Sequence, residues 1–263
     1  MENNQENIVN ISTPKDLIIS TWDIYSKKIG VLTGILAVPF ILSYLSGYFY
    51  EINQALAAIL SFTYLVAFFW AQVAILFVII DQKEVTSFQV AVQKGWSKIL
   101  PFFWLSLLSL FIIIGGFFLM IIPGIIFNVW FLFPSFILII ENKGGMDAFM
   151  RSKQLVTGYW LKIFGRTIFL FALVFLFISP IILVTMLIPF INTEIVSNLI
   201  SSFIVTPIVL IFSYLIYKDL IKIKLDTPAV VATTKDRVKF LTVGLIGWII
   251  GLIIIVSVIK QAT

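Results

Sequence analysis

Seven apolar runs dominate this sequence of 263 residues, and each has nearly the length needed to cross a lipid bilayer. A transmembrane helix needs about 20 apolar residues to span about 30 Å of hydrocarbon. Backbone polar groups inside hydrocarbon must be paired within the segment, so runs of this length predict helices. The predicted spans are residues 29–50, 55–80, 99–122, 124–140, 163–191, 195–217 and 240–259.

The overall composition agrees with a membrane location for these runs. The chain is 60% hydrophobic and 12% charged, and its mean hydropathy is +1.10. Soluble domains are about 45–50% apolar and about 25% charged, so this chain has too few charged groups to cover a water-exposed surface. We expect an all-α, polytopic membrane protein with a disordered tail (1–10), a six-span core (11–219), a basic loop (220–239) and a seventh span (240–263).

The third and fourth runs are separated only by Pro123 and Gly124. A single helix covering both runs would be about twice the length that a bilayer requires. We therefore predict a hairpin that turns at Pro123–Gly124, with the fourth span as the shortest of the seven.

Lysine and arginine are distributed very unevenly between the two sides of this topology. Of the 18 basic residues, 16 fall before the first span or in the loops after the second, fourth and sixth spans, Arg166 lies just inside the fifth span at the same side, and the exception is Lys260. Basic loops remain in the cytoplasm, so the N-terminus is predicted to be cytoplasmic and the C-terminus outside. No cleavable signal peptide is recognisable at the N-terminus. The expected location is the cytoplasmic membrane of a bacterium.

The segments that precede the first, third and fifth spans have helical patterns of their own. Thr13 followed by Pro14 and Asp16 is a helix-start signature, and Thr86 is a similar cap before the third span. Aromatic residues on one side and basic residues on the other are typical of helices that lie along a membrane surface. The alternative is a connecting helix packed against the cytoplasmic rim of the bundle.

An aromatic residue close to a lysine ends each of these three segments, at Lys28, Lys98 and Lys162. Tryptophan and tyrosine favour the membrane boundary, and lysine can extend its amine to the headgroups. The spacing of 70 and 64 residues favours a threefold repeat of connector helix, span, outer turn and span. Regular hairpins without a true repeat would produce part of the same pattern.

The residues offer no chemistry typical of an enzyme. The chain contains no cysteine and no histidine, so thiolate ligands, disulfides and the usual acid–base group near neutral pH are all missing. It has no phosphate-binding glycine loop, dinucleotide fingerprint or metal motif. We therefore predict a non-enzymatic protein without a cofactor or a metal site.

Two groups of polar residues are candidates for function. Arg151, Lys153 and Arg166, together with Glu141, lie near a span entrance and are candidates for contact with the headgroup of an anionic lipid. The alternative for Arg166 is a position at the interface, paired with Glu141 or with a lipid phosphate.

The second candidate group consists of polar residues within spans. Gln72, Asn128 and Thr206 are predicted to lie at mid-membrane depth, where they could line a cavity. Such residues more commonly form hydrogen bonds between helices, worth about 0.6–2 kcal/mol each. Both interpretations remain open at the level of sequence.

Residues 121–166 combine several short motifs that occur together in one family. They read I-P-G-I, then F-x-F-P, a glutamate that closes the span, D-A-F-M-R-S-K-Q-L-V-T-G, and an aromatic pair that opens the next span. This pattern resembles the membrane domain associated with bacterial glycerophosphodiester phosphodiesterases, and related stand-alone inner-membrane proteins, loosely from Lys15 to Tyr217. The positions that match the family pattern are Pro123, Gly124, Glu141, Ala148, Ser152, Leu155 and Gly158.

The resemblance implies six spans with amphipathic cytoplasmic connectors. In fused members of the family the hydrolase is a separate soluble domain with histidines, carboxylates and a divalent metal. This chain has no histidine and no segment for that domain, so phosphodiesterase activity is not expected of it.

The sequence favours two functions, and an enzyme ranks third behind them. The first is a non-enzymatic membrane protein that associates with anionic lipids or a partner protein through its basic cytoplasmic rim. The second is a transporter or permease for a small or lipid-like molecule. A polar cavity reached by water favours transport, whereas a bundle closed by phenylalanine and leucine favours the first function.

Overall fold

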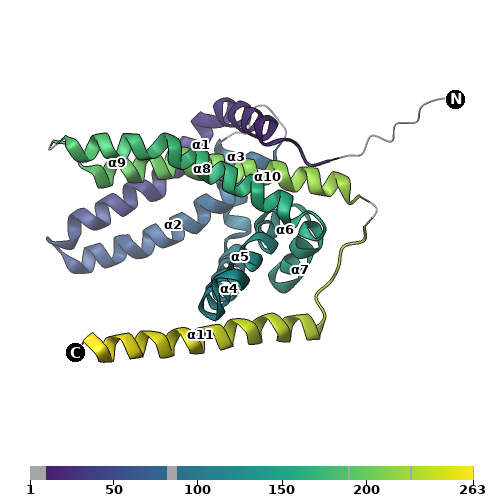
Figure 1. The fold of residues 1–263 in the computed structure, drawn as a ribbon. Helices are drawn as coiled ribbons and strands as arrows, with labels where there is room; N and C mark the ends of the chain where they lie inside the picture. The colour runs from purple at the N-terminus through teal and green to yellow at the C-terminus, as the bar shows by residue number, and fades with distance from the viewer. Residues whose placement is uncertain (1–9, 82–87, 189, 226, 263) are drawn as a thin grey trace.

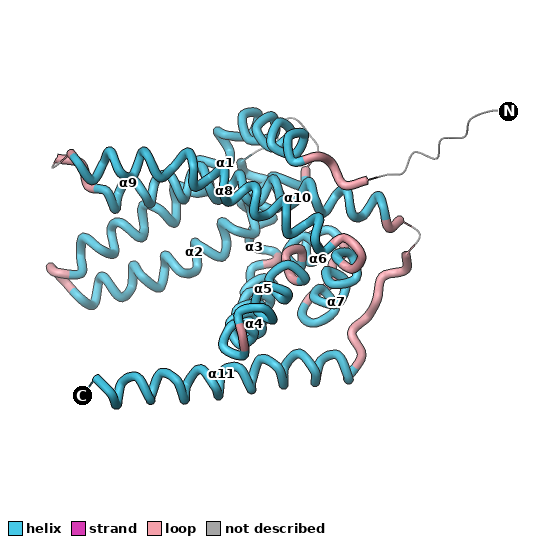
Figure 2. The backbone as a smooth tube through the Cα atoms, viewed as in Figure 1, coloured by secondary structure: helices cyan, strands magenta, loops and turns pink. Residues whose placement is uncertain are grey.

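The computed structural model describes residues 10–81, 88–188, 190–225 and 227–262, and no β-strand occurs among them (Figures 1 and 2). The predicted tail lies almost wholly outside the described residues, and so does the Thr86 cap. The helices are α1 (Pro14–Tyr50), α2 (Gln54–Ile80), α3 (Phe88–Ser97), α4 (Ile99–Leu119), α5 (Ile121–Trp130), α6 (Pro134–Ile140), α7 (Gly145–Val156), α8 (Trp160–Leu187), α9 (Thr193–Ile200), the π-helix η1 (Ser201–Val205), α10 (Thr206–Ile223) and α11 (Thr234–Ala262).

Seven helical segments among the described residues are long and apolar enough to cross a membrane, which confirms the prediction of an all-α protein and agrees with a multi-pass one. The fourth segment combines α5 with α6, and the sixth combines α9, η1 and α10. The segments are Pro14–Tyr50, Gln54–Ile80, Ile99–Leu119, Ile121–Ile140, Trp160–Leu187, Thr193–Ile223 and Thr234–Lys260.

Helix α1 begins as the sequence predicts but continues much further than one connector. The Thr13 hydroxyl accepts a hydrogen bond from the backbone N–H of Asp16 at 3.2 Å, and Pro14 occupies the first turn. The helix then runs without a break to Tyr50, so the first connector and the first span form one helix of 37 residues. Leu17 and Tyr25 in its first part are both buried.

The hairpin between the third and fourth spans turns at Met120 rather than at Pro123–Gly124. Met120 is the one extended residue between α4 and α5. Pro123 instead lies in the first turn of α5, where a missing N–H costs no helical hydrogen bond. Gly124 faces α4, because a Cβ placed there would lie 2.4 Å from the Phe117 ring. The glycine therefore serves close packing of the two helices rather than the turn.

The fourth span is interrupted between α5 and α6, and one hydroxyl bridges the interruption. Pro134 begins α6 and has no N–H to donate to the carbonyl of Trp130, four residues earlier. The Ser152 hydroxyl, from α7, donates to that carbonyl at 2.7 Å and accepts from the N–H of Phe133 at 3.2 Å. Ser152 is fully buried. It therefore satisfies both backbone groups that the break leaves unpaired.

The turns show which ends of the helices share a side. The α1–α2 turn, the α8–α9 turn and the C-terminus lie at one end of the molecule, and the α10–α11 linker lies at the other (Figure 1). The second end carries the lysines at the end of α10, and we call it the basic end. We call the first end the opposite end.

Helix α11 packs on α4 through glycines. Each backbone occupies the space that a side chain would need on the other helix: a Cβ at Gly247 would lie 1.8 Å from the carbonyl oxygen of Gly115, and a Cβ at Gly115 would lie 2.5 Å from that of Gly244. The indole N–H of Trp248 donates to the carbonyl of Phe111 at 3.1 Å. Small residues permit such close approach of helices in lipid, where packing rather than the hydrophobic effect drives association.

The other two connectors form α3 and α7, and they differ in burial. In α3 only Ala91 and Gly95 are buried, whereas eight residues of α7 are buried, Phe149 and Leu155 completely. Helix α7 contacts α4, α5, α6 and α10. The burial of α7 agrees with the alternative prediction of a connecting helix packed against the bundle. The position of α3 and α7 relative to the lipid stays a prediction.

Candidate functional site

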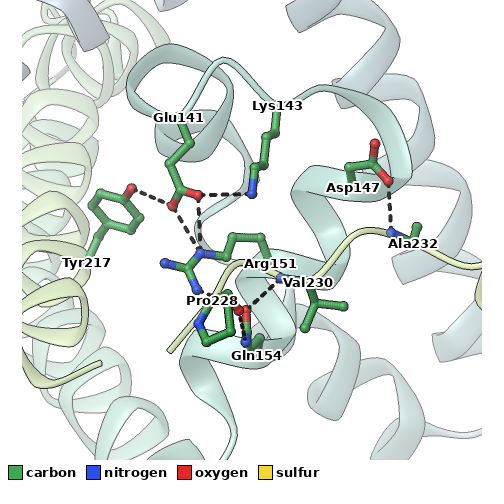
Figure 3. A network of polar contacts seen from close by, with 9 residues as sticks. All are labelled: Glu141, Lys143, Asp147, Arg151, Gln154, Tyr217, Pro228, Val230 and Ala232. Atoms are coloured by element: carbon green, nitrogen blue, oxygen red, sulfur yellow. Dashed lines mark hydrogen bonds and ion pairs between the residues drawn. The ribbon is translucent and has the colours of Figure 1, made fainter. Parts of the chain in front are cut away.

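A cluster of charged and polar side chains joins α6, α7 and α10 at the basic end (Figure 3). The Nε of Arg151 donates to both carboxylate oxygens of Glu141 at 3.2 Å, and the Tyr217 hydroxyl donates to one of them at 3.2 Å. Lys143 lies 3.6 Å from the same carboxylate. The Arg151 and Glu141 side chains are only 8% and 17% exposed. A carboxylate this buried requires such partners, so we interpret the cluster as a structural clamp.

The clamp extends to the linker that leads to α11. Gln154 accepts from Arg151 at 2.9 Å and from the N–H of Val230 at 3.2 Å, and it donates to the carbonyl of Pro228 at 2.9 Å. Asp147 accepts from the N–H of Ala232 at 2.9 Å (Figure 3). Helix α7 therefore fixes the linker along its length, and with it the start of α11.

Lys224, just after the end of α10, joins the clamp by binding the C-terminal end of α7. Its ammonium group donates to the carbonyl of Thr157 at 2.7 Å and to that of Gln154. Burial lowers the pKa of Lys224, and the nearby positive charge of Arg151 lowers it further. The two carbonyls at the end of α7 stabilise the ammonium in this position.

The structure gives the predicted lipid-contacting cations separate internal partners. Arg151 belongs to the clamp, and the ammonium of Lys153 lies 4.7 Å from the centre of the Trp130 ring. The guanidinium of Arg166 donates to the carbonyls of Ile11, Ser12 and Lys162, each at 2.9 Å.

The predicted pairing of Arg166 with Glu141 is therefore wrong. Arg166, near the start of α8, faces the segment before α1, whereas Glu141 faces α7 and α10. Contact of these side chains with a lipid headgroup stays a prediction.

A polar crevice lies between α1, α2 and the α9–η1–α10 segment, with a volume of about 600 Å³. This volume falls within the range of about 300–1,000 Å³ that is usual for small-molecule sites. Gln72 and Thr206 line it, whereas Asn128 is exposed on α5 and is not among its lining residues. The lining also includes Asn192 and Glu194 near the α8–α9 turn, so the crevice begins at the opposite end of the molecule (Figure 1).

Three helical stripes form the walls, each with members four residues apart. Side chains four apart lie on one face of a helix. Two stripes are mainly aromatic and come from α1 and α2, and the third is polar and comes from the α9–η1–α10 segment. The stripes are Leu36, Phe40, Tyr44 and Tyr48; Tyr64, Phe68 and Gln72; and Glu194, Asn198, Ser202 and Thr206.

The crevice extends well into the membrane-spanning part of the fold. Thr206 lies 13 positions after Thr193, which corresponds to roughly 20 Å along a helix. Beyond this level the same helices continue with buried apolar side chains, which separate the crevice from the basic end. These side chains are Leu32, Ile35, Ile75, Leu76 and Ile211.

The helix that carries the polar stripe is irregular where it borders the crevice. Residues 201–205 form a π-helix, and the N–H and hydroxyl of Thr206 both donate to the carbonyl of Ser201. Pro207 has no N–H for the carbonyl of Phe203, and the Tyr25 hydroxyl of α1 donates to that carbonyl instead, at 3.0 Å. Pro39 adds a second proline on the α1 wall. Single π-turns within α-helices are frequently found at functional sites.

The sequence predicts only Gln72 and Thr206 among the residues that line the crevice, although the four-residue spacing of the stripes can be seen in the sequence. Glu194 and the tyrosines of α1 and α2 are not among the site residues that the sequence predicts. The four-residue spacing from Glu194 to Thr206 was the signal that could have found the polar wall. No sequence pattern specifies that this wall faces the tyrosines of α1 and α2, because an apolar or aromatic helix face in a membrane can meet either another helix or acyl chains.

Comparison of the chain with protein-family models, with curated proteins and with solved structures finds no match in any of the three.

Proposed function

We propose that this chain is a non-enzymatic permease-type membrane protein that admits a small molecule into the crevice between α1, α2 and α9–η1–α10. The observation that carries the proposal is the crevice itself, which is about 600 Å³ in volume and has Gln72 and Thr206 among its lining residues. Membrane helices normally bury such polar side chains against each other. Here Gln72 and Thr206 border open space instead. A polar cavity is the feature that we expect of a transporter rather than of a purely structural protein.

The irregular helices suggest how the crevice could change shape. Transport requires a site that opens to one side and then to the other, usually through bending or rocking of helices. Pro39, the π-helix and Pro207 interrupt the hydrogen bonding of two walls at the level of the crevice. The hydrogen bond from the Tyr25 hydroxyl to the Phe203 carbonyl stabilises the crevice in the shape that the structure shows. We propose that these positions are the hinges.

The basic end has a supporting role in this proposal. Exposed lysines there can contact anionic headgroups of the cytoplasmic leaflet and so orient the protein, at about 1 kcal/mol for each lysine. These are Lys15, Lys222, Lys235 and Lys239. We further propose that the protein lies in a bacterial cytoplasmic membrane with its N-terminus inside, in keeping with the resemblance to phosphodiesterase membrane domains.

Labelling of introduced cysteines tests the proposed function, because the chain has no cysteine of its own. We expect Gln72→Cys to react with a membrane-impermeant maleimide added from outside intact cells, since Gln72 lines the crevice. Ala74→Cys is the matched control, because Ala74 is two positions away on the same helix and fully buried. We expect its labelling to be slower by at least about tenfold, the factor that corresponds to 1.4 kcal/mol of protection.

The side of labelling separates a permease from a closed binding site. A permease exposes Gln72→Cys to reagent from the cytoplasmic side as well, in a fraction of molecules that rises when the Tyr25→Phe change removes the bond to Phe203. Labelling from neither side would contradict the crevice. Labelling from outside alone, unchanged by Tyr25→Phe, would contradict transport.

A further inference from the structure

The crevice has walls whose charge and aromatic character indicate one class of ligand. Glu194 is the one charged side chain among the described residues that line it. Glu194 takes part in none of the ion pairs found among the described residues. Lys260, the basic residue predicted on the same side of the membrane, belongs to α11, which packs on α4 rather than on the crevice helices. The field at this site is therefore negative, with a carboxylate at its entrance.

The aromatic residues provide a second source of attraction for a cation. Three tyrosines and two phenylalanines line the crevice, and the face of an aromatic ring attracts a cation through its quadrupole. Tyrosines near a membrane boundary ordinarily anchor a helix among the headgroups. Tyr44, Tyr48 and Tyr64 differ in that they lie on the two walls of one crevice, opposite a polar wall. Several rings around one space can enclose a cation on more than one side.

The polar wall has hydrogen-bonding groups of both kinds. Asn198, Ser202 and Thr206 continue the stripe inward from Glu194. The Thr206 hydroxyl already donates to the carbonyl of Ser201, so its oxygen is left to accept. Acceptors beyond a carboxylate suit an ammonium N–H or a hydroxyl carried by the same ligand.

Together these walls exclude other ligand classes. A phosphate or carboxylate would meet Glu194 without any lysine or arginine among the described lining residues to receive it. A wholly apolar molecule would bury Gln72, Asn198 and Ser202 without partners, which is costly. A small metal cation prefers several oxygen ligands of high charge density, whereas this crevice has one carboxylate.

We infer that the crevice binds a small organic cation, an amine or quaternary ammonium compound, with Glu194 attracting its charge and the tyrosines of α1 and α2 enclosing it. This inference rests on the proposed function, since it names the substrate class of the same crevice. The ligand enters from the opposite end, passes Glu194 and reaches Gln72 and Thr206 at the inner limit.

Protection of Gln72→Cys against labelling tests the ligand class, with choline as the probe. Its uncharged isostere, 3,3-dimethylbutan-1-ol, is the control, because it has the same shape without the charge. At equal millimolar concentrations we expect choline to slow the reaction with an uncharged maleimide by at least about fivefold, and the alcohol to slow it less than about 1.5-fold. Adding Glu194→Gln should abolish most of the protection, while labelling without choline stays the same.

The outcomes separate this inference from the function on which it rests. If Gln72→Cys does not react at all, the crevice and the proposed function both fail. If it reacts but the alcohol protects as well as choline, or Glu194→Gln leaves protection intact, the crevice stands and the cation inference is wrong. Protection by an organic anion such as isethionate in place of choline would also overturn it. Slow labelling of Ala74→Cys in the Glu194→Gln background shows that the variant is folded, because Ala74 is buried.

Discussion

Replacing Gly247 with leucine is expected to separate α11 from α4 and to lower the stability of the protein by about 3 kcal/mol or more. A Cβ added at this position would lie 1.8 Å from the carbonyl oxygen of Gly115, which is closer than any two such atoms can approach. The obstacle is backbone rather than a movable side chain, so the helices must move apart. This movement also pulls the Trp248 indole from the Phe111 carbonyl, to which it donates at 3.1 Å.

Thermal unfolding in detergent measures this effect, together with tryptic cleavage in the first turn of α11. We expect the apparent melting temperature to fall by roughly 5–10 °C and cleavage after Lys235 and Arg237 to accelerate. Gly165→Leu is the matched control, because a Cβ at Gly165 meets nothing within 4 Å. Equal stability and equal cleavage in the two variants would contradict the glycine-mediated packing of α11.

The second large effect is expected at the clamp, from Arg151→Met. This change leaves the Glu141 carboxylate with Tyr217 and the more distant Lys143, although it is only 17% exposed. Removing one partner of a buried ion pair costs about 3–5 kcal/mol, chiefly because the other charge stays buried. The Gln154 contact is lost as well, which loosens the linker. We expect a loss of about 3 kcal/mol.

A double variant separates the stranded charge from the lost packing. Combining Arg151→Met with Glu141→Gln removes the uncompensated carboxylate, while an amide oxygen can still accept from Tyr217. We expect chemical or thermal unfolding to show that the double variant recovers at least about half of the lost stability. Lys27→Met is the control, since the Lys27–Asp23 pair is 58% exposed on both sides and contributes less than about 1 kcal/mol. A double variant as unstable as Arg151→Met would show that the stranded charge is not the cause.

Apolar length predicts the spans well, because it reflects a requirement of the bilayer that does not depend on tertiary contacts. All seven predicted runs overlap the seven helical segments, and the cap at Thr13 is confirmed because capping is a local interaction. The hairpin turn was misplaced for a related reason. Proline was read as a turn, although it is equally compatible with the first turn of a helix, where Pro123 lies.

The partners of polar residues could not be predicted, because they depend on which helix faces which. In lipid an apolar face does not reveal whether it meets a helix or an acyl chain. Pro134 and Pro207 each predict that the backbone carbonyl four residues earlier lacks its helical donor. Nothing in the sequence indicates that Ser152 and Tyr25 supply the missing hydrogen bonds. The same limit applies to Arg166, which binds backbone carbonyls from the far end of the chain.

The central claim, that a polar crevice between three helices takes up a small molecule, is tested most directly by spin labels placed singly at residues 194–206. Glu194, Asn198, Ser202 and Thr206 line the crevice. The account predicts that labels at these four positions collide with a water-soluble nickel complex more than with oxygen, because the crevice admits water and excludes lipid. Leu199 and Ile204, which are exposed and lie outside the crevice lining, should show the reverse. Preferential collision with oxygen at Ser202 and Thr206 would place them against lipid and contradict the account.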